Sequence, residues 1–270
     1  MKKRITLGLA ALLTMSTVAF AQPEPGTFSI TPRIGLSMSN MLDEVADEMM
    51  FEFVELDGYN HFYGRRSSDD IKYRLGFSGG VDFQWHRSER WAFVTGLDYS
   101  LQGCRFEHEY HRPDLLGNPA LTFVSWDEKD VRINLHYFSV PIMAKLYLGH
   151  GFALNGGVQV GWLWRAYEKH HVDFVLDKGG DYYIVSGAGD FEQTVEGGTL
   201  YGKDINEKIT DQYHRVNIEI PVGFSYEYGP YVADVRAKIG TNDIADYGDA
   251  KVRNIGFVFS LGYRFDFKIR

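Results

Sequence analysis

The chain contains a single cysteine, Cys104, and therefore cannot form an intrachain disulfide. It also lacks an excess of basic residues, because 28 Lys and Arg stand against 36 Asp and Glu, a formal net charge of -8. Nucleic-acid binding depends on Lys and Arg that neutralise phosphates, so this balance argues against a nucleic-acid partner. A chain without disulfides needs another source of stability, and a closed hydrogen-bonded barrel is one.

Long apolar runs are also missing, since no segment after the N-terminal region reaches the about 18 consecutive apolar residues of a transmembrane helix. The N-terminal region has a basic start at Lys2–Arg4, a short apolar core at Ile5–Val18 and the small-residue site Ala19–Ala21. This order is typical of a secretory signal peptide. A membrane anchor is the alternative, but the apolar core is shorter than a spanning helix needs. We expect a signal peptide at 1–21 and one mature domain at 22–270.

What the chain does contain is a repeated alternation of apolar and polar side chains, which is clearest near the C-terminus. Every second residue from Ile255 to Phe267 is apolar or aromatic, and those between include Gly256, Arg264 and Asp266. Side chains alternate across a strand, whereas a helix would mix the two sets on every face. The same alternation predicts eight strands: Phe28–Met38, Ile71–Trp85, Trp91–Gln102, Val131–Leu148, Phe152–Ala166, Val216–Tyr228, Tyr231–Gly240 and Asn254–Phe267.

The connections between these strands alternate strictly between long and short. The long ones are Asn40–Asp70, Gly103–Asp130, Tyr167–Gln212 and Thr241–Arg253, and the short ones are His86–Arg90, Gly149–Gly151 and Gly229–Pro230. A short helical turn around Met41–Met50 is compatible with the first long connection. Outer-membrane barrels have long extracellular loops on one rim and short periplasmic turns on the other. The sequence therefore predicts an all-β, eight-stranded antiparallel up-and-down transmembrane β-barrel.

The polar faces of these strands carry many charges of both signs. Burying them in a soluble core would be costly unless each were paired, and a soluble lipocalin-like barrel should have an apolar interior. An eight-stranded barrel has a lumen that side chains just fill, so we expect a plugged wall and not an open pore. The predicted lumen charge network comprises Arg33, Arg74, Asp82, Asp98, Glu219, Asp234, Arg236, Lys238, Arg264 and Asp266.

One member of this network, Glu219, lies in the middle of a strand beside Pro221. A carboxylate among Arg and Lys side chains could serve as a proton or substrate relay. It could also be a buried salt-bridge partner, and we favour that structural interpretation. Removing it should then leave a lumen cation unpaired and weaken the barrel.

Aromatic residues are abundant, with 17 Tyr, 19 Phe and 5 Trp. Trp and Tyr concentrate at membrane–water interfaces, and those near the short turns predict a periplasmic girdle: Trp85, Trp91, Tyr147, Phe152, Tyr228, Tyr231, Phe265 and Phe267. Tyr99, Trp162, Trp164 and Phe257 lie nearer the other rim. The segment Val131–Leu148 changes the parity of its apolar residues between Tyr137 and Phe138, which predicts a β-bulge there, close to Pro141.

Three segments resemble the PorT-like type of bacterial outer-membrane β-barrel family found in Bacteroidetes. They are YFSVPIMAKLYL (Tyr137–Leu148), NIEIPVGFSYEYGPY (Asn217–Tyr231) and NIGFVFSLGYRF (Asn254–Phe265). The resemblance implies an outer-membrane location and an eight-stranded barrel, but no single function, because such families include structural proteins and secretion components. The chain departs from the usual aromatic end of such barrels, since Lys268–Arg270 follow Phe267.

Catalytic chemistry has little support, because the chain has no Gly-rich phosphate cradle, nucleophile elbow or zinc signature. A hydrolase at the extracellular rim is the alternative function, and its candidate residues are loop histidines with acids nearby: His108, His111, His170, His171 and His214. Ser139 and His136 have opposite parity and make a poor nucleophile pair. We expect a non-enzymatic barrel without metal or cofactor, structural or part of a secretion or transport assembly. Its expected partners are outer-membrane lipid, the barrel assembly machinery and an extracellular or envelope protein bound through the loops.

Overall fold

The computed structural model describes residues 24–43, 50–56, 59–66, 71–106, 110–113, 123–176, 191–195, 198–245 and 251–268. The predicted signal peptide at 1–21 lies outside these ranges and stays a prediction. Within them, no helix is both long enough and apolar enough to cross a membrane.

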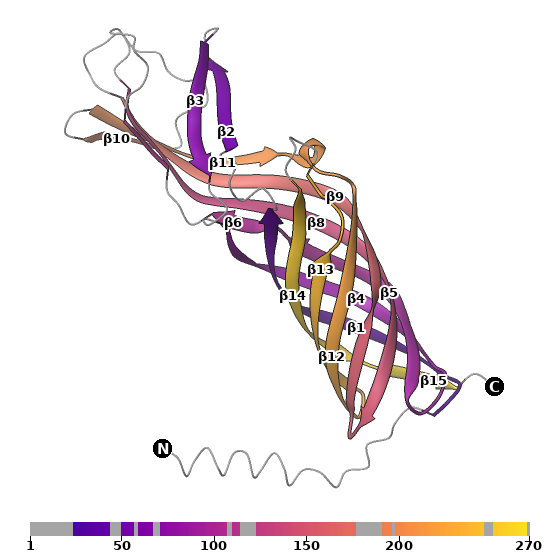
Figure 1. Cartoon of the computed structure of the whole chain (residues 1–270). Helices are drawn as coiled ribbons and strands as arrows, with labels where there is room; N and C mark the ends of the chain where they lie inside the picture. The colour runs from indigo at the N-terminus through magenta and orange to yellow at the C-terminus, as the bar shows by residue number, and fades with distance from the viewer. Residues whose placement is uncertain are drawn as a thin grey trace, which may run out of the picture.

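Eight strands form a closed antiparallel ring, as the alternation predicted. Each ring strand pairs with the next ring strand along the chain, and the last ring strand pairs with the first (Figure 1). The short strands of the long connections are not members of this ring. The ring strands are β1 (Thr27–Asp43), β4 (Ile71–His86), β5 (Trp91–Gln102), β8 (Phe123–Gly149), β9 (Phe152–Leu176), β12 (Val216–Tyr228), β13 (Tyr231–Gly240) and β14 (Val252–Tyr263). The predicted fold class is therefore confirmed.

The first and last strands close the barrel. Arg33 of β1 pairs with Gly262 of β14, and the ladder continues upward to Asp43 and Val252. The predicted last strand is divided at Arg264, beyond which β15 (Phe265–Lys268) pairs with the start of β1, Thr27 opposite Lys268. Closure leaves no unpaired sheet edge in the bilayer, where unsatisfied backbone groups would each cost several kcal/mol.

The two faces of the wall have opposite polarity. Large apolar side chains point outward and are 67% exposed at Ile34, 73% at Leu75 and 69% at Ile142. Their strand neighbours point inward, where Asp98 and Glu219 are each only 1% exposed. This is the reverse of a soluble barrel and the arrangement of a membrane barrel, with lipid outside and polar side chains inside.

Three of the predicted connections contain strands that the sequence did not indicate. In the first, β2 (Met50–Leu56) pairs with β3 (Tyr59–Arg66). The start of the expected helical turn at Met41 belongs to β1, so that interpretation is wrong there, and residues 44–49 lie outside the described part. The other two connections contain β6 (Cys104–Phe106), β7 (Tyr110–Pro113), β10 (Phe191–Val195) and β11 (Gly198–Lys208).

The ring strands β8 and β9 also extend far beyond the predicted ends, to 27 and 25 residues. They stay paired from Gly149 and Phe152 at one end to Phe123 and Leu176 at the other. Figure 1 shows this hairpin leaving the barrel with β11 and β10 beside it. A strand outside the bilayer needs no continuous lipid-facing side, which explains why apolar alternation failed to predict these segments.

The predicted bulge in the β8 segment is wrong. Burial alternates without a break through Leu135, Tyr137 and Ser139, so β8 keeps its parity. The extra residue lies on β9, where His136 pairs with Arg165 but Tyr137 pairs with Leu163. The bulge leaves both Trp164 and Arg165 exposed on β9.

In β8 the apolar residues change from odd to even positions after Tyr137. The reason is that the upper part of the lumen is itself apolar. Tyr137 and Leu135 are fully buried there, together with Leu163 from β9. The complete lumen cap consists of Met41, Cys104, Ile133, Leu135, Tyr137, Leu163, Ala166, Ile209, Tyr213, Ile244, Ala245 and Val252. It includes residues beside η2 (Thr210–Gln212) and from the last long connection, joined by a bridge between Tyr213 and Ala245. We use the name lumen cap for this cluster below.

Two adjacent glycines of β9 give a matched test of packing in the wall. A Cβ on Gly157 would overlap the carbonyl oxygen of Ile142, whereas a Cβ on Gly156 would have only the Pro221 oxygen nearby, at 3.7 Å. We expect Gly157→Ala to destabilise the barrel by about 1–3 kcal/mol through overpacking. Gly156→Ala should change stability by less than about 1 kcal/mol. Urea unfolding in lipid vesicles measures both, and equal midpoints would contradict the packing argument.

Candidate functional site: the lumen charge network

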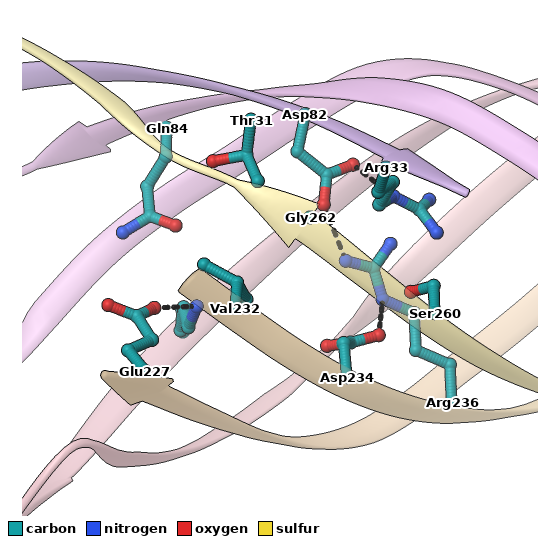
Figure 2. Close-up of a pocket in the computed structure, with 11 residues that line it drawn as sticks. Thr31, Arg33, Asp82, Gln84, Glu227, Val232, Asp234, Arg236, Ser260 and Gly262 are labelled. Atoms are coloured by element: carbon teal, nitrogen blue, oxygen red, sulfur yellow. Dashed lines mark hydrogen bonds and ion pairs between the residues drawn. The ribbon is translucent and has the colours of Figure 1, made fainter. Parts of the chain in front are cut away.

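The centre of the lower lumen is an alternating chain of arginines and aspartates. Arg236 of β13 contacts Asp82 of β4 through Nη2 at 2.6 Å and Asp234 through Nε at 2.7 Å. Arg33 of β1 contacts the same Asp82 at 3.2 Å and also pairs with Asp98 of β5. Figure 2 shows the two guanidinium groups directed at Asp82. All five side chains are at most 9% exposed, so each charge depends on the others for compensation.

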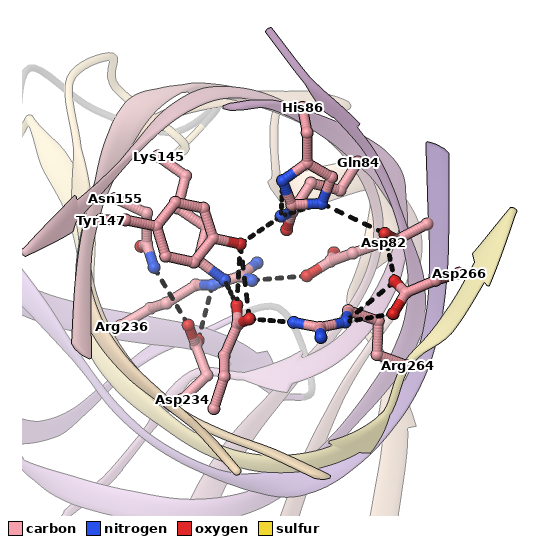
Figure 3. Close-up of polar contacts among 12 residues, drawn as sticks. Asp82, Gln84, His86, Lys145, Tyr147, Asn155, Asp234, Arg236, Arg264 and Asp266 are labelled. Carbon is pink, nitrogen blue, oxygen red and sulfur yellow. Dashed lines mark hydrogen bonds and ion pairs between the residues drawn. The ribbon is translucent and has the colours of Figure 1, made fainter. Parts of the chain in front are cut away.

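A second cluster lies nearer the periplasmic turns and is centred on Glu227 of β12. Its carboxylate accepts from Lys145 of β8 and from Arg264, which follows β14. The Tyr147 hydroxyl donates to the same carboxylate at 3.1 Å. Arg264 is also 3.0 Å from Asp266 through Nε. One acid is thus held by two cations and a phenol, with Lys145 and Tyr147 on β8 and Arg264 after β14 (Figure 3).

Hydrogen bonds continue this second cluster across the lumen floor. The Gln84 amide donates to the Tyr147 hydroxyl at 2.5 Å and lies 2.9 Å from Nε2 of His86. The Ser29 hydroxyl lies 3.1 Å from the same histidine nitrogen and donates to Asp266 at 2.7 Å. Figure 3 shows His86, Gln84 and Tyr147 linked by dashed lines inside the barrel.

For several of these residues, the position predicted from the sequence was wrong. Tyr147 is not part of the aromatic girdle, because it is 4% exposed and inside the lumen. His86 is not in a polar turn, because it ends β4 and is 1% exposed. Lys145 was missed, although it alternates with outward-facing Ala144 and Leu146. The available signal was its odd position, opposite to that of the outward-facing apolar residues of β8.

Glu219 lies higher in the lumen, between the charged clusters and the lumen cap. It accepts a hydrogen bond of 2.8 Å from the Gln159 amide, and no ion pair to it is found among the described residues. Lys238 is also buried in the lumen, at 3% exposure, and its Nζ has no hydrogen-bond partner within the described part. The predicted direct salt bridge is therefore replaced by an amide contact, with Lys238 as a nearby unpaired cation.

Glu219 offers a test of whether its charge or its hydrogen bond matters. Glu219→Ala removes the acceptor of the Gln159 amide and the negative charge near Lys238. We expect a loss of about 1–3 kcal/mol, the cost of an unsatisfied buried polar group. Glu219→Gln keeps a hydrogen-bond acceptor and should retain part of that stability. The temperature of the heat-modified gel shift measures the effect, and an unchanged temperature for the alanine variant would contradict it.

The structure brings together most of the predicted network. Arg33, Asp82, Asp98, Asp234 and Arg236 form the central chain described above. Arg264 joins the cluster around Glu227, and Asp266 contacts it with a side chain that is 43% exposed. Arg74 lies near the upper end of β4, and its buried Nε and Nη1 have no hydrogen-bond partner within the described part. It is not part of either cluster.

Little space remains between the two charged clusters. The cavity there is lined by residues such as Thr31, Gln84 and Ser260 and measures about 10 Å³, room for about one water molecule. Figure 2 shows side chains from several strands converging on it. Among the described residues, this small cavity and the buried lumen cap above it leave little free space in the lumen.

The loop histidines form no catalytic constellation within the described residues. His170 Nδ1 lies 3.6 Å from Glu168, and His171 Nδ1 lies 2.6 Å from Asp204. No group of three potential metal ligands occurs in the described part of the chain. His214 is exposed beside η2, while His108 and the side chain of His111 lie outside the described part.

The possible nucleophile pair on the wall is also separated. Ser139 is buried in the lumen, at 1% exposure. His136 contacts the Tyr99 hydroxyl at 2.7 Å and the ring of Tyr167 instead. Ser139 and His136 therefore do not form a nucleophile pair.

Comparison with known proteins gives a family and a set of distant structures. Residues 20–268 match the family model described as outer membrane protein beta-barrel domain. The structure of Ail, the attachment invasion locus protein of Yersinia pestis, is 11% identical, with 89% of this chain and 99% of that chain covered and a TM-score of 0.37. Neisserial surface protein A is 10% identical, with the same coverage and a TM-score of 0.34. No curated protein matches the chain.

Proposed function

The chain belongs to the outer membrane protein beta-barrel domain family, and from this membership we propose that it is a closed, non-enzymatic barrel that acts through its extracellular strands. The lumen supports this proposal, because ion pairs fill its lower part and the lumen cap fills its upper part. A wall without a passage leaves the parts outside the bilayer as the place for a specific role.

The observation that carries the proposal is the continuous pairing of β8 and β9 beyond the barrel. β11 extends the sheet on the β9 side, and β7 extends it on the β8 side. A paired sheet holds its shape better than a free loop, and it presents backbone and side chains at a fixed distance from the membrane. Its proposed partner is an extracellular or envelope protein, within a structural or secretion assembly.

Three finer assignments are proposed with it. The PorT-like type is supported by the segments Tyr137–Leu148 and Asn217–Tyr231. Export by a signal peptide at 1–21 is supported by its basic, apolar and small-residue regions. Insertion by the barrel assembly machinery is supported by the closed ring, since such a barrel cannot enter the bilayer strand by strand without exposing edges.

The test is a variant in which residues 172–203 are replaced by a short Gly-Ser turn, which removes the outer part of β9 together with β10 and the start of β11. Cross-linking on intact cells should give partner adducts with the natural chain and lose them with this variant. A variant with the same Gly-Ser segment inserted after Ser88, in a periplasmic turn, is the control. Adducts that survive the shortening would contradict the proposal, provided that both variants keep the heat-modified gel shift.

The alternative is a hydrolase at the extracellular rim, and the pair of His171 and Asp204 is the observation in its favour. Purified barrel is expected to show no peptide or ester hydrolysis above a His171→Ala variant. Turnover that disappears in this variant, with the barrel still folded, would favour the enzyme.

A further inference from the structure

Residues 241–245 follow the end of β13 and lie at the extracellular mouth of the barrel. We call this segment the rim strap. Its last two residues, Ile244 and Ala245, are 0% and 4% exposed and belong to the lumen cap. Its first residue, Thr241, is exposed. The rim strap therefore contributes to the lumen cap although it belongs to none of the eight ring strands.

Polar side chains attach the first half of the rim strap to the start of β12. The Asn242 side-chain oxygen accepts a hydrogen bond of 2.6 Å from the Ile218 N–H, and its nitrogen donates to the Val216 carbonyl at 2.9 Å. The Thr241 hydroxyl donates to the Ile218 carbonyl at 3.0 Å. These three hydrogen bonds are exposed to solvent, so water can replace them when the segment moves.

Backbone groups hold the buried half of the rim strap. The His214 N–H donates to the Ile244 carbonyl at 2.9 Å, and the Ile244 N–H donates to the Val252 carbonyl at 2.9 Å. The Asp243 carboxylate accepts from the N–H groups of Ala245 and Val252, at 3.0 and 2.9 Å. Each of these hydrogen bonds involves the rim strap itself and is not a rung between two ring strands. Their loss therefore leaves the ring closed.

Other parts of the lumen cap are held more firmly. Leu135 and Leu163 lie on β8 and β9, whose ladder is continuous through the bilayer, where separated strands would leave backbone groups unsatisfied. The connection before β12 is anchored by Thr210, whose buried hydroxyl contacts both the N–H and the carbonyl of Ala166. Segments with exposed hydrogen bonds open locally at the lowest free energy. In the lumen cap, the rim strap is such a segment.

We propose that the rim strap is a lid that swings out of the barrel mouth while the ring of strands stays closed. The movement breaks the exposed hydrogen bonds of Asn242 and takes Ile244 and Ala245 out of the lumen cap. The upper lumen then opens to the extracellular side, whereas the ion pairs of Arg236 still fill the lower part. This lid is independent of the proposed partner binding, because its movement needs no contact with the extracellular strands.

The test uses Cys104, the one cysteine of the chain, which is fully buried in the lumen cap. The full barrel in phosphatidylcholine vesicles is treated with a small maleimide, and intact mass spectrometry gives the rate of modification. The natural chain should react slowly. Asn242→Ala should react about tenfold faster or more, because it removes the two hydrogen bonds between this side chain and β12. Asn242→Asp keeps the acceptor for the Ile218 N–H and should show a smaller increase.

The matched control is Asn206→Ala, since Asn206 is exposed on β11 and does not belong to the lumen cap. It should react at the natural rate. Hydrogen exchange then shows which part of the barrel opens. In Asn242→Ala the His214 N–H should exchange faster, because its acceptor lies on the rim strap. The N–H of Tyr137 on β8 should keep its natural rate. The heat-modified gel shift verifies that each variant is folded.

Three results overturn the proposal. The first is equal maleimide reactivity of Asn242→Ala and Asn206→Ala, which would mean that the rim strap does not guard the lumen cap. The second is faster exchange at both His214 and Tyr137, since the wall would then open together with the strap. The third is modification of the natural chain as fast as that of the urea-unfolded chain, because the lid would then never be closed.

Discussion

Arg236→Ala is expected to lower the free energy of unfolding by about 3–5 kcal/mol, the usual cost of removing one partner from a buried ion pair. The guanidinium of Arg236 is 4% exposed and contacts both Asp82 and Asp234. Its loss leaves Asp234 without its cation, and Asp82 would keep only Arg33. Neither carboxylate can turn to water, because both side chains are at most 9% exposed.

The control for Arg236→Ala is another arginine that pairs with an aspartate. Arg215 lies 3.3 Å from Asp211 at the extracellular rim, with side chains 43% and 91% exposed. Arg215→Ala should cost at most about 1 kcal/mol, because solvent screens such a pair. Urea unfolding in lipid vesicles, followed by tryptophan fluorescence, measures both variants. Similar losses for the two would show that the central chain of ion pairs does not hold the lumen together.

The strands inside the bilayer could be predicted from the sequence because their two faces contact different environments, lipid on one side and the lumen on the other. Lipid requires apolar side chains on one face, and the narrow lumen accepts polar ones on the other, so each crossing strand has a period of two. Val216–Tyr228 was predicted with the limits that β12 has in the structure. Outside the bilayer water contacts the sheet, and the alternation that revealed β12 has no counterpart in the outer part of β8.

Only part of the candidate site could be predicted from the sequence. Parity placed Arg236 and Asp82 on inward faces, but they are 154 residues apart in the chain, and nothing local indicates that they touch. Their contact depends on the stagger of the strands around the ring, which links strand tilt to register. The second cluster was missed for a different reason. Lys145 and Tyr147 alternate with apolar residues that were predicted to face outward, but Lys145 was not included among the lumen charges, and Tyr147 was assigned to the aromatic girdle because it lies close to a short turn.

The buried apolar residues of Val131–Tyr137 show that the lumen has a charged part and an apolar part along its axis. Ion pairs occupy the half near the short turns, and the lumen cap occupies the half below the extracellular strands. A polar lumen alone can admit water between its charges. An apolar layer above it excludes water, because most of its side chains carry no polar group. The cap, and not the charge network, is therefore the feature that should set the resistance of the barrel to leakage.

Leu135→Ala should test this role, because Leu135 is fully buried at the centre of the lumen cap. Truncation of a buried leucine costs about 2–5 kcal/mol, the sum of a transfer term and a cavity term. The cavity forms inside a rigid ring that cannot collapse on it, so we expect the upper half of that range. In planar bilayers the natural barrel should be silent, and the variant should show brief conducting events as the cap opens.

Leu261→Ala is the matched control, since Leu261 lies on the lipid-facing side of β14 and is 69% exposed. Mobile lipid chains fill the space that its side chain leaves, so the cavity term is absent and the loss of stability should be clearly smaller. Because Leu261 does not contact the lumen cap, its truncation should leave the barrel silent. If Leu135→Ala were as stable and as silent as Leu261→Ala, the lumen cap would be neither the seal nor a core of the fold. Conduction by the natural barrel would contradict the closed lumen itself.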